Sequence, residues 1–144
     1  MADSATPAVK LNKVDQIGIV VRDAGKVMES WTTLFGIGPW TERVLDMKDV
    51  DGKPGKVRLC FADLGGIQLE LIEPVEGRIF HSQHLDEHGE GLHHLGFRVD
   101  DVDAEAENVV GAGGKVMYAR PDAFSYLDTG GPGGVIFEMI RAPR

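Results

Sequence analysis

The chain has 144 residues, with 15 basic and 23 acidic side chains and a net charge of −8 at pH 7. This acidic balance argues against a nucleic-acid-binding protein, which needs a basic face. A chain of this length buries enough surface to fold without a disulfide or a structural metal. We therefore expect any metal that it holds to serve catalysis.

The chain shows no sign of export or membrane insertion. No apolar run approaches the ~20 residues of a membrane span, and the first ten residues lack the apolar core of a signal peptide. The single cysteine, Cys60, cannot close an internal disulfide. These features predict a cytoplasmic protein without a membrane partner, and a short disordered tail over 1–10.

Two pairs of segments indicate an internal duplication. Ile17–Asp23 resembles Leu95–Asp101, 78 positions later, with glycine, valine and aspartate in common. Gly65–Ile72 resembles Gly133–Ile140, with four of eight positions identical. Because the two pairs occur in the same order, chance similarity between apolar strands is a poor explanation.

Each copy predicts a strand, a helix and three further strands, which makes an α+β fold of two βαβββ modules. The expected elements of the first copy cover 14–21, 24–35, 40–47, 56–63 and 67–73. Those of the second cover 93–99, 102–110, 114–119, 124–128 and 134–140. We expect a tail over 1–10, a first module over 11–77, a linker helix within 78–92 and a second module over 93–144, all in one compact domain.

Residues typical of helix ends support the two long helices. Asp23 and Asp101 stand where an N-cap is expected, and Gly36 and Gly111 stand where each apolar periodicity stops.

Two glutamates occupy unfavourable positions in the expected strands. Glu70 lies between leucines and an isoleucine, and Glu138 recurs at the equivalent position of the second copy. A mid-strand carboxylate among apolar residues is costly unless it lines a polar cavity or binds a cation. One such residue is more often simply exposed, but its recurrence in both copies favours a function.

The first strands supply complementary side chains, because Gln16 aligns with His94. If the modules pack about a pseudo-twofold axis, Gln16, Glu70, His94 and Glu138 converge. One imidazole nitrogen and three oxygens suit a single divalent ion of the Zn, Co, Ni, Mn or Fe kind. The alternative is that Gln16 and His94 are only satisfied polar residues at strand starts.

Other polar residues have simpler interpretations. His84 and His88 are four residues apart, a spacing at which two histidines can bind a metal on one face of a helix. They lack an HExxH arrangement, and we interpret them as helix surface. His93 should point away from the cup because it precedes His94 on a strand. Trp40 is either core or cavity wall.

Tyr126 lies on one face of its expected strand with Asp128. We expect this face to approach a substrate, with Tyr126 as a binding residue.

The duplicated pattern, the run Gly-Glu-Gly-Leu-His-His over 89–94 and the closing Val-Ile-Phe-Glu over 135–138 resemble the vicinal oxygen chelate (glyoxalase/bleomycin resistance/dioxygenase) superfamily, in particular the methylmalonyl-CoA epimerases. The resemblance extends from Lys13 to Ile140. It implies a curved mixed sheet, a half-barrel, around a metal cup and a homodimer. It also implies the same four ligands as the repeat.

Two positions depart from the epimerase pattern. The epimerases usually carry histidine where this chain has Gln16, and glutamine there resembles eukaryotic glyoxalase I. Arg58 stands where the epimerases place a second carboxylate base. Arginine cannot abstract a proton at pH 7, so Arg58 is expected to bind a substrate carboxylate or phosphate.

The resemblance and the residues together predict a metal-dependent isomerase/epimerase or lyase acting on a small molecule with a carbonyl, such as an acyl-CoA thioester. Glu138 is the expected catalytic base, and Glu70 is a ligand and second base. Two alternatives remain: a glyoxalase I-type lactoylglutathione lyase, favoured by Gln16, and a metal-free small-molecule binding or resistance protein. A ring-cleaving dioxygenase fits less well, because its iron site usually has two histidines and one carboxylate, and Gln16 stands in place of one histidine.

Overall fold

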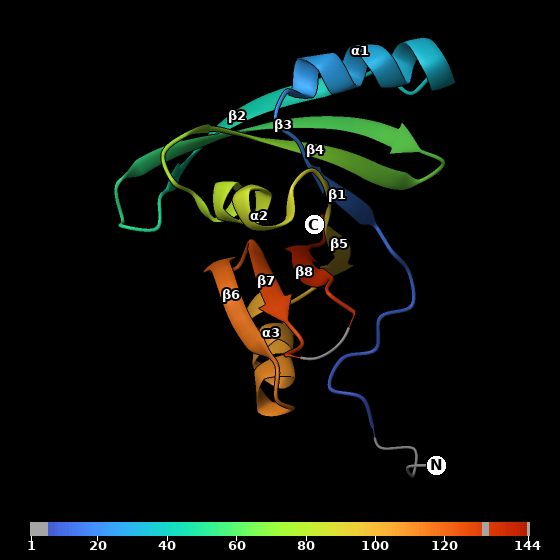
Figure 1. Cartoon of the computed structure of the whole chain (residues 1–144). Helices are drawn as coiled ribbons and strands as arrows, with labels where there is room; N and C mark the ends of the chain where they lie inside the picture. Colours follow the sequence, from blue (N-terminus) through green and yellow to red (C-terminus); the bar gives the residue numbers. More distant parts are fainter. Residues whose placement is uncertain (1–5, 131–132, 144) are drawn as a thin grey trace. The chain divides into compact units, whose positions relative to one another are not determined.

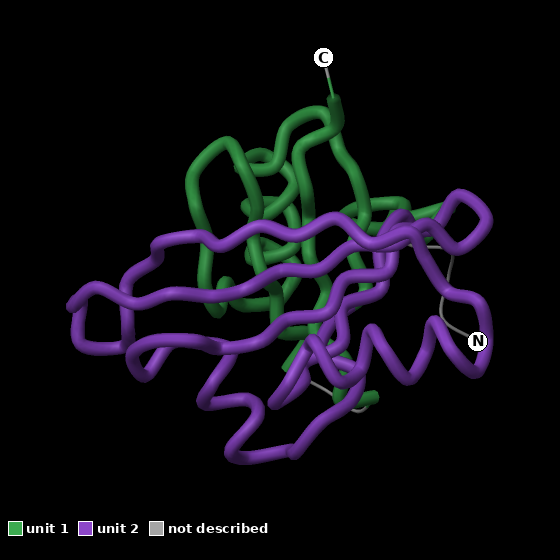
Figure 2. Tube along the Cα trace, turned by 90° about the horizontal axis from the view of Figure 1, so that it is seen from above, with its two compact units in different colours: residues 1–14, 95–144 green, residues 15–94 purple. Residues whose placement is uncertain are grey.

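The computed structural model describes residues 6–130 and 133–143. These residues carry eight strands and three helices (Figure 1). The order is strand, helix and three strands, then a helix, then strand, helix and three strands again. The predicted α+β class and the tandem βαβββ pattern are therefore confirmed. The chain divides into two compact units, unit 2 with residues 15–94 and unit 1 with residues 1–14 and 95–144 (Figure 2).

Unit 2 contains the first copy of the repeat and the helix that follows it. Its elements are β1 (Gln16–Val20), α1 (Ala24–Phe35), β2 (Thr41–Lys48), β3 (Pro54–Leu64), β4 (Ile67–Glu76), α2 (Phe80–His88) and the first part of β5 (Gly91–Val99). The strands lie in the order β2-β3-β4-β1. β4 runs parallel to β1 and antiparallel to β3, so the sheet is mixed as predicted.

The two faces of this sheet carry different layers, because successive side chains of a strand alternate. On one face, Cys60 and Leu71 pack with Ala24 of α1. On the other, Val57 and Ile72 pack with Ile79, which precedes α2. Figure 1 shows α1 and α2 on opposite sides of the sheet.

The ends of α1 follow from the local sequence. The side chain of Asp23 accepts a hydrogen bond from the amide of Lys26 and caps the first turn. Gly36 ends the helix at φ 68°, a left-handed conformation that favours glycine. Both assignments were predicted.

Unit 1 contains the second copy, with the rest of β5, α3 (Val102–Gly111), β6 (Lys115–Arg120), β7 (Phe124–Asp128) and β8 (Ile136–Arg141). β7 pairs antiparallel with both β6 and β8. Asp101 caps α3 through the amide of Ala104, as predicted. The core of this unit comprises Val102, Ala106, Leu127 and Met139.

Two predicted segments fall partly outside the described residues. Residues 1–5 of the expected tail are not among them. Residues 6–10 form no helix or strand, although Val9 packs against the unit 1 core. Residues 131–132 and 144 of the expected second module over 93–144 are also outside the described part of the chain. Within that part, no helix combines the length and apolarity needed to cross a membrane.

Candidate functional site

Three of the four predicted metal ligands meet in unit 2. Gln16 opens β1, Glu70 lies in the middle of β4, and His94 is in β5. All three are buried, His94 completely. The Nε2 atom of His94 lies 2.7 Å from Oε1 of Gln16 and 3.5 Å from Oε1 of Glu70. These side chains come from strands that are far apart in the sequence, yet they share one small polar site.

Strand register explains why Gln16 and Glu70 share a face. In the parallel pair of β1 and β4, Gln16 lies opposite Gln68 and Gly18 lies opposite Glu70. Directly paired residues point to the same side of a sheet, and so do residues two apart on one strand. The face therefore presents three polar side chains, and Gly18 has none.

The missing side chain at Gly18 makes room for His94. A Cβ atom built on Gly18 would lie 2.1 Å from Cε1 of the His94 imidazole. No real Cβ makes such a contact, so the ring lies directly on the glycine backbone. The repeated apolar-glycine step in the sequence thus has a structural reason in the first copy.

A second amide orients Gln16. Its Nε2 donates a hydrogen bond of 2.8 Å to Oε1 of Gln68. The carbonyl oxygen of Gln16 therefore faces His94, as a metal ligand must. Sequence alternation puts Gln68 beside Glu70, but nothing in the sequence indicates that it holds Gln16.

The donor set of this site suits a divalent cation. One imidazole nitrogen lies within contact distance of one amide oxygen and one carboxylate oxygen, and the buried carboxylate needs a compensating positive charge. Across the described residues, no three His, Cys, Asp or Glu side chains come together as a metal site. The third donor of this group is the Gln16 amide.

The fourth predicted ligand, Glu138, belongs to unit 1. It lies on β8, is 6% exposed, and is paired directly with Tyr126 of β7. Paired residues share a face, so a substrate that reaches Glu138 would also approach Tyr126, which is likewise buried. The convergence of Glu138 with the three ligand candidates of unit 2 and the binding role of Tyr126 stay predictions.

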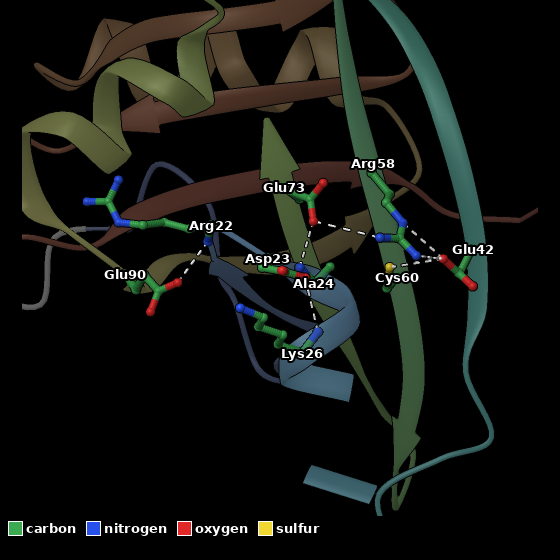
Figure 3. A network of polar contacts seen from close by, with 9 residues as sticks. All are labelled: Arg22, Asp23, Ala24, Lys26, Glu42, Arg58, Cys60, Glu73 and Glu90. Carbon is green, nitrogen blue, oxygen red and sulfur yellow. Dashed lines mark hydrogen bonds and ion pairs between the residues drawn. The ribbon is translucent and has the colours of Figure 1, made fainter. Parts of the chain in front are cut away.

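Arg58 takes part in a polar network on the α1 face (Figure 3). Its guanidinium contacts Glu42, with Nε 2.9 Å from the carboxylate, and lies 3.7 Å from Glu73. The hydrogen bond with Glu42 raises the pKa of Arg58. Glu73 also accepts a hydrogen bond of 2.6 Å from the amide of Ala24 at the start of α1. The network therefore links three strands, β2, β3 and β4, to the N-terminus of α1.

This network lies on the face of the sheet opposite the candidate site. Arg58 is paired with Glu73 on β4, and paired side chains share a face. Glu70, which is paired with Phe61, lies three positions before Glu73, so its side chain points to the other face of the sheet. Trp40 also packs on the α1 side, where its Nε1 donates to Oγ1 of Thr32. The substrate-binding roles of Arg58 and Trp40 stay predictions, and the geometry of unit 2 gives them no support.

His93, the residue before His94 on β5, is a polar neighbour of the candidate site. It was expected to point away from the site, and its ring contacts α2, but its Nδ1 lies 2.9 Å from Nδ1 of His94. His93 is 1% exposed, and burial lowers its pKa, so its imidazole is neutral. Strand alternation sends adjacent side chains apart, so only the structure shows this contact.

Two histidines of α2, His81 and His84, lie next to the His93 ring. His84 and His88 have ring centroids 4.5 Å apart, and His84 is 4.6 Å from His93. Burial lowers the pKa of His84. His88 is exposed, in keeping with its interpretation as helix surface, but His84 is half-buried against His93, so that interpretation was wrong for His84.

Comparison with known proteins places this geometry in a family context. The family model described as "Glyoxalase/Bleomycin resistance protein/Dioxygenase superfamily" matches residues 15–126. The chain is also 30% identical over 87 residues to the uncharacterized protein YqjC of Bacillus subtilis (strain 168). That alignment covers 60% of this chain and 57% of the relative.

Similar solved structures include methylmalonyl-CoA epimerases. A Streptomyces coelicolor methylmalonyl-CoA epimerase variant in complex with 2-nitronate-propionyl-CoA is 25% identical, with a TM-score of 0.70. The match covers 94% of this chain and 100% of that chain. The Mycobacterium tuberculosis epimerase, 24% identical with a TM-score of 0.69, shares the fold over 96% of this chain and 93% of its own.

Proposed function

Because the chain belongs to the Glyoxalase/Bleomycin resistance protein/Dioxygenase superfamily, we propose that it is a divalent-metal-dependent isomerase/epimerase or lyase. The reaction would begin with abstraction of a proton next to a carbonyl group. The observation that supports this proposal best is the contact of His94 Nε2 with oxygens of Gln16 and Glu70. Such a donor set in a buried site is suited to a cation and has little use in a purely structural role.

In the proposed site, Gln16, Glu70 and His94 hold the cation together with Glu138. A bound Zn, Co, Ni, Mn or Fe ion supplies a Lewis acid that polarises the substrate carbonyl and stabilises an enolate oxygen. The burial of the three residues of unit 2 keeps bulk water from competing with the substrate.

Glu138 is the proposed base, a ligand that is only loosely held or is displaced when the substrate binds. Its carboxylate takes the proton from the carbon next to the carbonyl, and the electrons of the broken C–H bond move to the carbonyl oxygen. Epimerisation then requires a proton on the opposite face of that carbon. Since the position of the second epimerase base is occupied by Arg58, Glu70 is the proposed second base: after it takes a proton from solvent, it delivers that proton to the opposite face, and in the reverse direction it removes it.

The proposed substrate is an acyl-CoA thioester. A complex with 2-nitronate-propionyl-CoA is known for the similar Streptomyces coelicolor epimerase. The proposal also includes a homodimer in the cytoplasm.

The proposed chemistry does not use the cysteine of the chain. Cys60 is buried, and burial raises the pKa of its thiol to about 11. Such a thiol is unreactive at neutral pH.

The test is isotope exchange. Protein loaded with each candidate metal is incubated with methylmalonyl-CoA in D₂O, and deuterium at the α-carbon is measured by mass spectrometry. We expect exchange by the wild type and a loss of at least ~10²-fold in Glu138→Gln. Glu107→Gln, an exposed change on α3, serves as the matched control. Undiminished exchange in Glu138→Gln would remove the assigned role of that residue.

Glyoxalase I-type chemistry is the second candidate, favoured by the amide oxygen of Gln16 at His94 Nε2. It is distinguished by lactoylglutathione formation from methylglyoxal and glutathione.

Elemental analysis of protein purified without chelator tests both enzyme proposals against a metal-free binding protein. A chain that carries no metal and gains no activity with any would favour the binding protein.

A further inference from the structure

The two adjacent histidines of β5 form a hydrogen-bonded pair beneath the candidate site. Nδ1 of His93 lies 2.9 Å from Nδ1 of His94, while Nε2 of His94 faces Gln16. Both rings are almost completely buried. A neutral imidazole carries one N–H and one lone pair, so the two contacts of His94 depend on each other.

The amide of Gln16 determines which nitrogen of His94 carries the proton when the two side chains are hydrogen-bonded directly. Since Gln16 donates its Nε2 hydrogen to Gln68, its carbonyl oxygen is the atom facing His94. An amide oxygen only accepts, so His94 Nε2 donates. The Nδ1 atom of a neutral His94 then carries a lone pair, and the Nδ1–H of His93 donates to it.

A cation at His94 Nε2 reverses this arrangement. The ligating nitrogen must present its lone pair, so the ring proton of His94 moves to Nδ1. A proton at Nδ1 needs an acceptor, and the nearest is Nδ1 of His93, which must then hold its own proton on Nε2. The proton arrangement that His94 needs toward the Gln16 oxygen therefore cannot persist once a cation is bound at Nε2.

We propose that His93 is a positioning residue for His94 and that the two histidines exchange tautomers when the site takes up its metal. The Nδ1 proton of His93 passes to Nδ1 of His94, the Nε2 proton of His94 leaves to solvent, and a solvent proton adds to Nε2 of His93. Both rings stay neutral, and the pair releases no net proton. This inference rests on the metal site of the proposed function.

The helix α2 holds His93 in place for this role. Phe80 meets the His93 ring edge-on at a centroid distance of 5.6 Å, and the rings of His81 and His84 lie 5.0 and 4.6 Å away. This packing restricts rotation of the ring. Partners of this kind, which orient a ligating histidine, typically change metal affinity by 10–100-fold when they are removed.

Two variants separate hydrogen bonding from packing. In His93→Asn, the amide can present either an oxygen or an N–H near the position of Nδ1, so it supports both states of His94. In His93→Leu, a methyl group takes that position and supports neither. Zinc affinity of the full chain is measured by competition with a chromophoric chelator. We expect His93→Leu to bind zinc about 10–100-fold more weakly and His93→Asn within ~3-fold of the wild type.

The spectroscopic test uses ¹⁵N-labelled wild-type chain. Two-bond ¹H–¹⁵N spectra assign the tautomer of each histidine before and after zinc is added. We expect His94 to change from Nε2–H to Nδ1–H and His93 from Nδ1–H to Nε2–H. These spectra also decide the matter if His93→Leu does not fold.

Zinc binding with unchanged tautomers, or equal zinc affinity in the two variants, would overturn the exchange while the proposed metal site survives. A wild-type chain that binds no zinc or other divalent ion would remove the proposed function and the exchange with it.

Discussion

The imidazole of His94 lies on the backbone of Gly18, in space that any larger residue would fill. A Cβ atom at Gly18 would be 2.1 Å from Cε1, 2.4 Å from Nδ1 and 2.6 Å from Nε2 of that ring. All three atoms belong to a buried ring whose two nitrogens already have partners. The ring therefore cannot move aside without losing contacts to Gln16 or His93.

Gly18→Ala should displace His94 and weaken zinc binding by at least ~10-fold, with a cost of about 1–3 kcal/mol in the free energy of unfolding. Chelator competition and urea unfolding measure the two effects. Gly111→Ala is the matched control, because a Cβ at that position in α3 meets nothing within 4 Å. Wild-type zinc affinity in Gly18→Ala would contradict the role of the glycine.

Glu70 and Glu76 offer a test on a single strand. Both lie on β4, but Glu70 is buried beside His94 and Glu76 is exposed. Glu70→Gln removes the negative charge that favours a dication, so we expect zinc affinity to fall by at least ~10-fold. Glu76→Gln should leave it unchanged. Equal affinities of both variants, measured by isothermal titration, would show that Glu70 is no ligand.

Arg58 is expected to stabilise unit 2 and not to touch the substrate. Its guanidinium joins Glu42 and Glu73 on the α1 face, and its side chain is 30% exposed. Arg58→Leu should lower the free energy of unfolding by about 1 kcal/mol and leave KM for an acyl-CoA substrate near the wild-type value. Lys56→Leu, two residues earlier on the same strand face, is the control. A KM raised ~10-fold only in Arg58→Leu would restore its predicted role in substrate binding.

Acid should destabilise the fold through His81. Burial lowers the pKa of His81 from 6.5 to about 3. Between pH 6.5 and pH 3, His81 is therefore protonated in the unfolded chain and neutral in the folded chain. The stability that this group contributes is complete above pH 6.5 and is lost as the pH falls toward 3, by about 1.4 kcal/mol per pH unit. Urea unfolding at pH 7, 5.5 and 4.5 should show a shallower loss in His81→Gln. Parallel pH profiles of the two proteins would contradict this assignment.

Much of the secondary structure was predictable because its signals are local. Asp23 and Asp101 cap their helices through the amides three residues on, and Gly36 adopts the left-handed conformation that ends α1. The duplication added the information that single strands lack, since Glu70 became conspicuous only beside its counterpart Glu138. The ligand candidates Gln16, Glu70 and His94 came from that comparison, and the structure brings these three together.

The contacts around the ligands were not predictable, because they depend on register and packing. Alternation on β3 and β4 decides that Arg58 faces α1 while Glu70 faces His94, and a shift of one residue in pairing would have exchanged these environments. The sequence by itself determined the order of elements and the types of donor atom, because both follow from residue identity and periodicity. Only the tertiary structure decided that Gly18 supports the His94 ring, that Gln68 turns the Gln16 amide, and that His93 reaches His94. Each of these is a contact between groups far apart in the sequence or on opposite sides of a strand, and such contacts are fixed only when strands and helices pack.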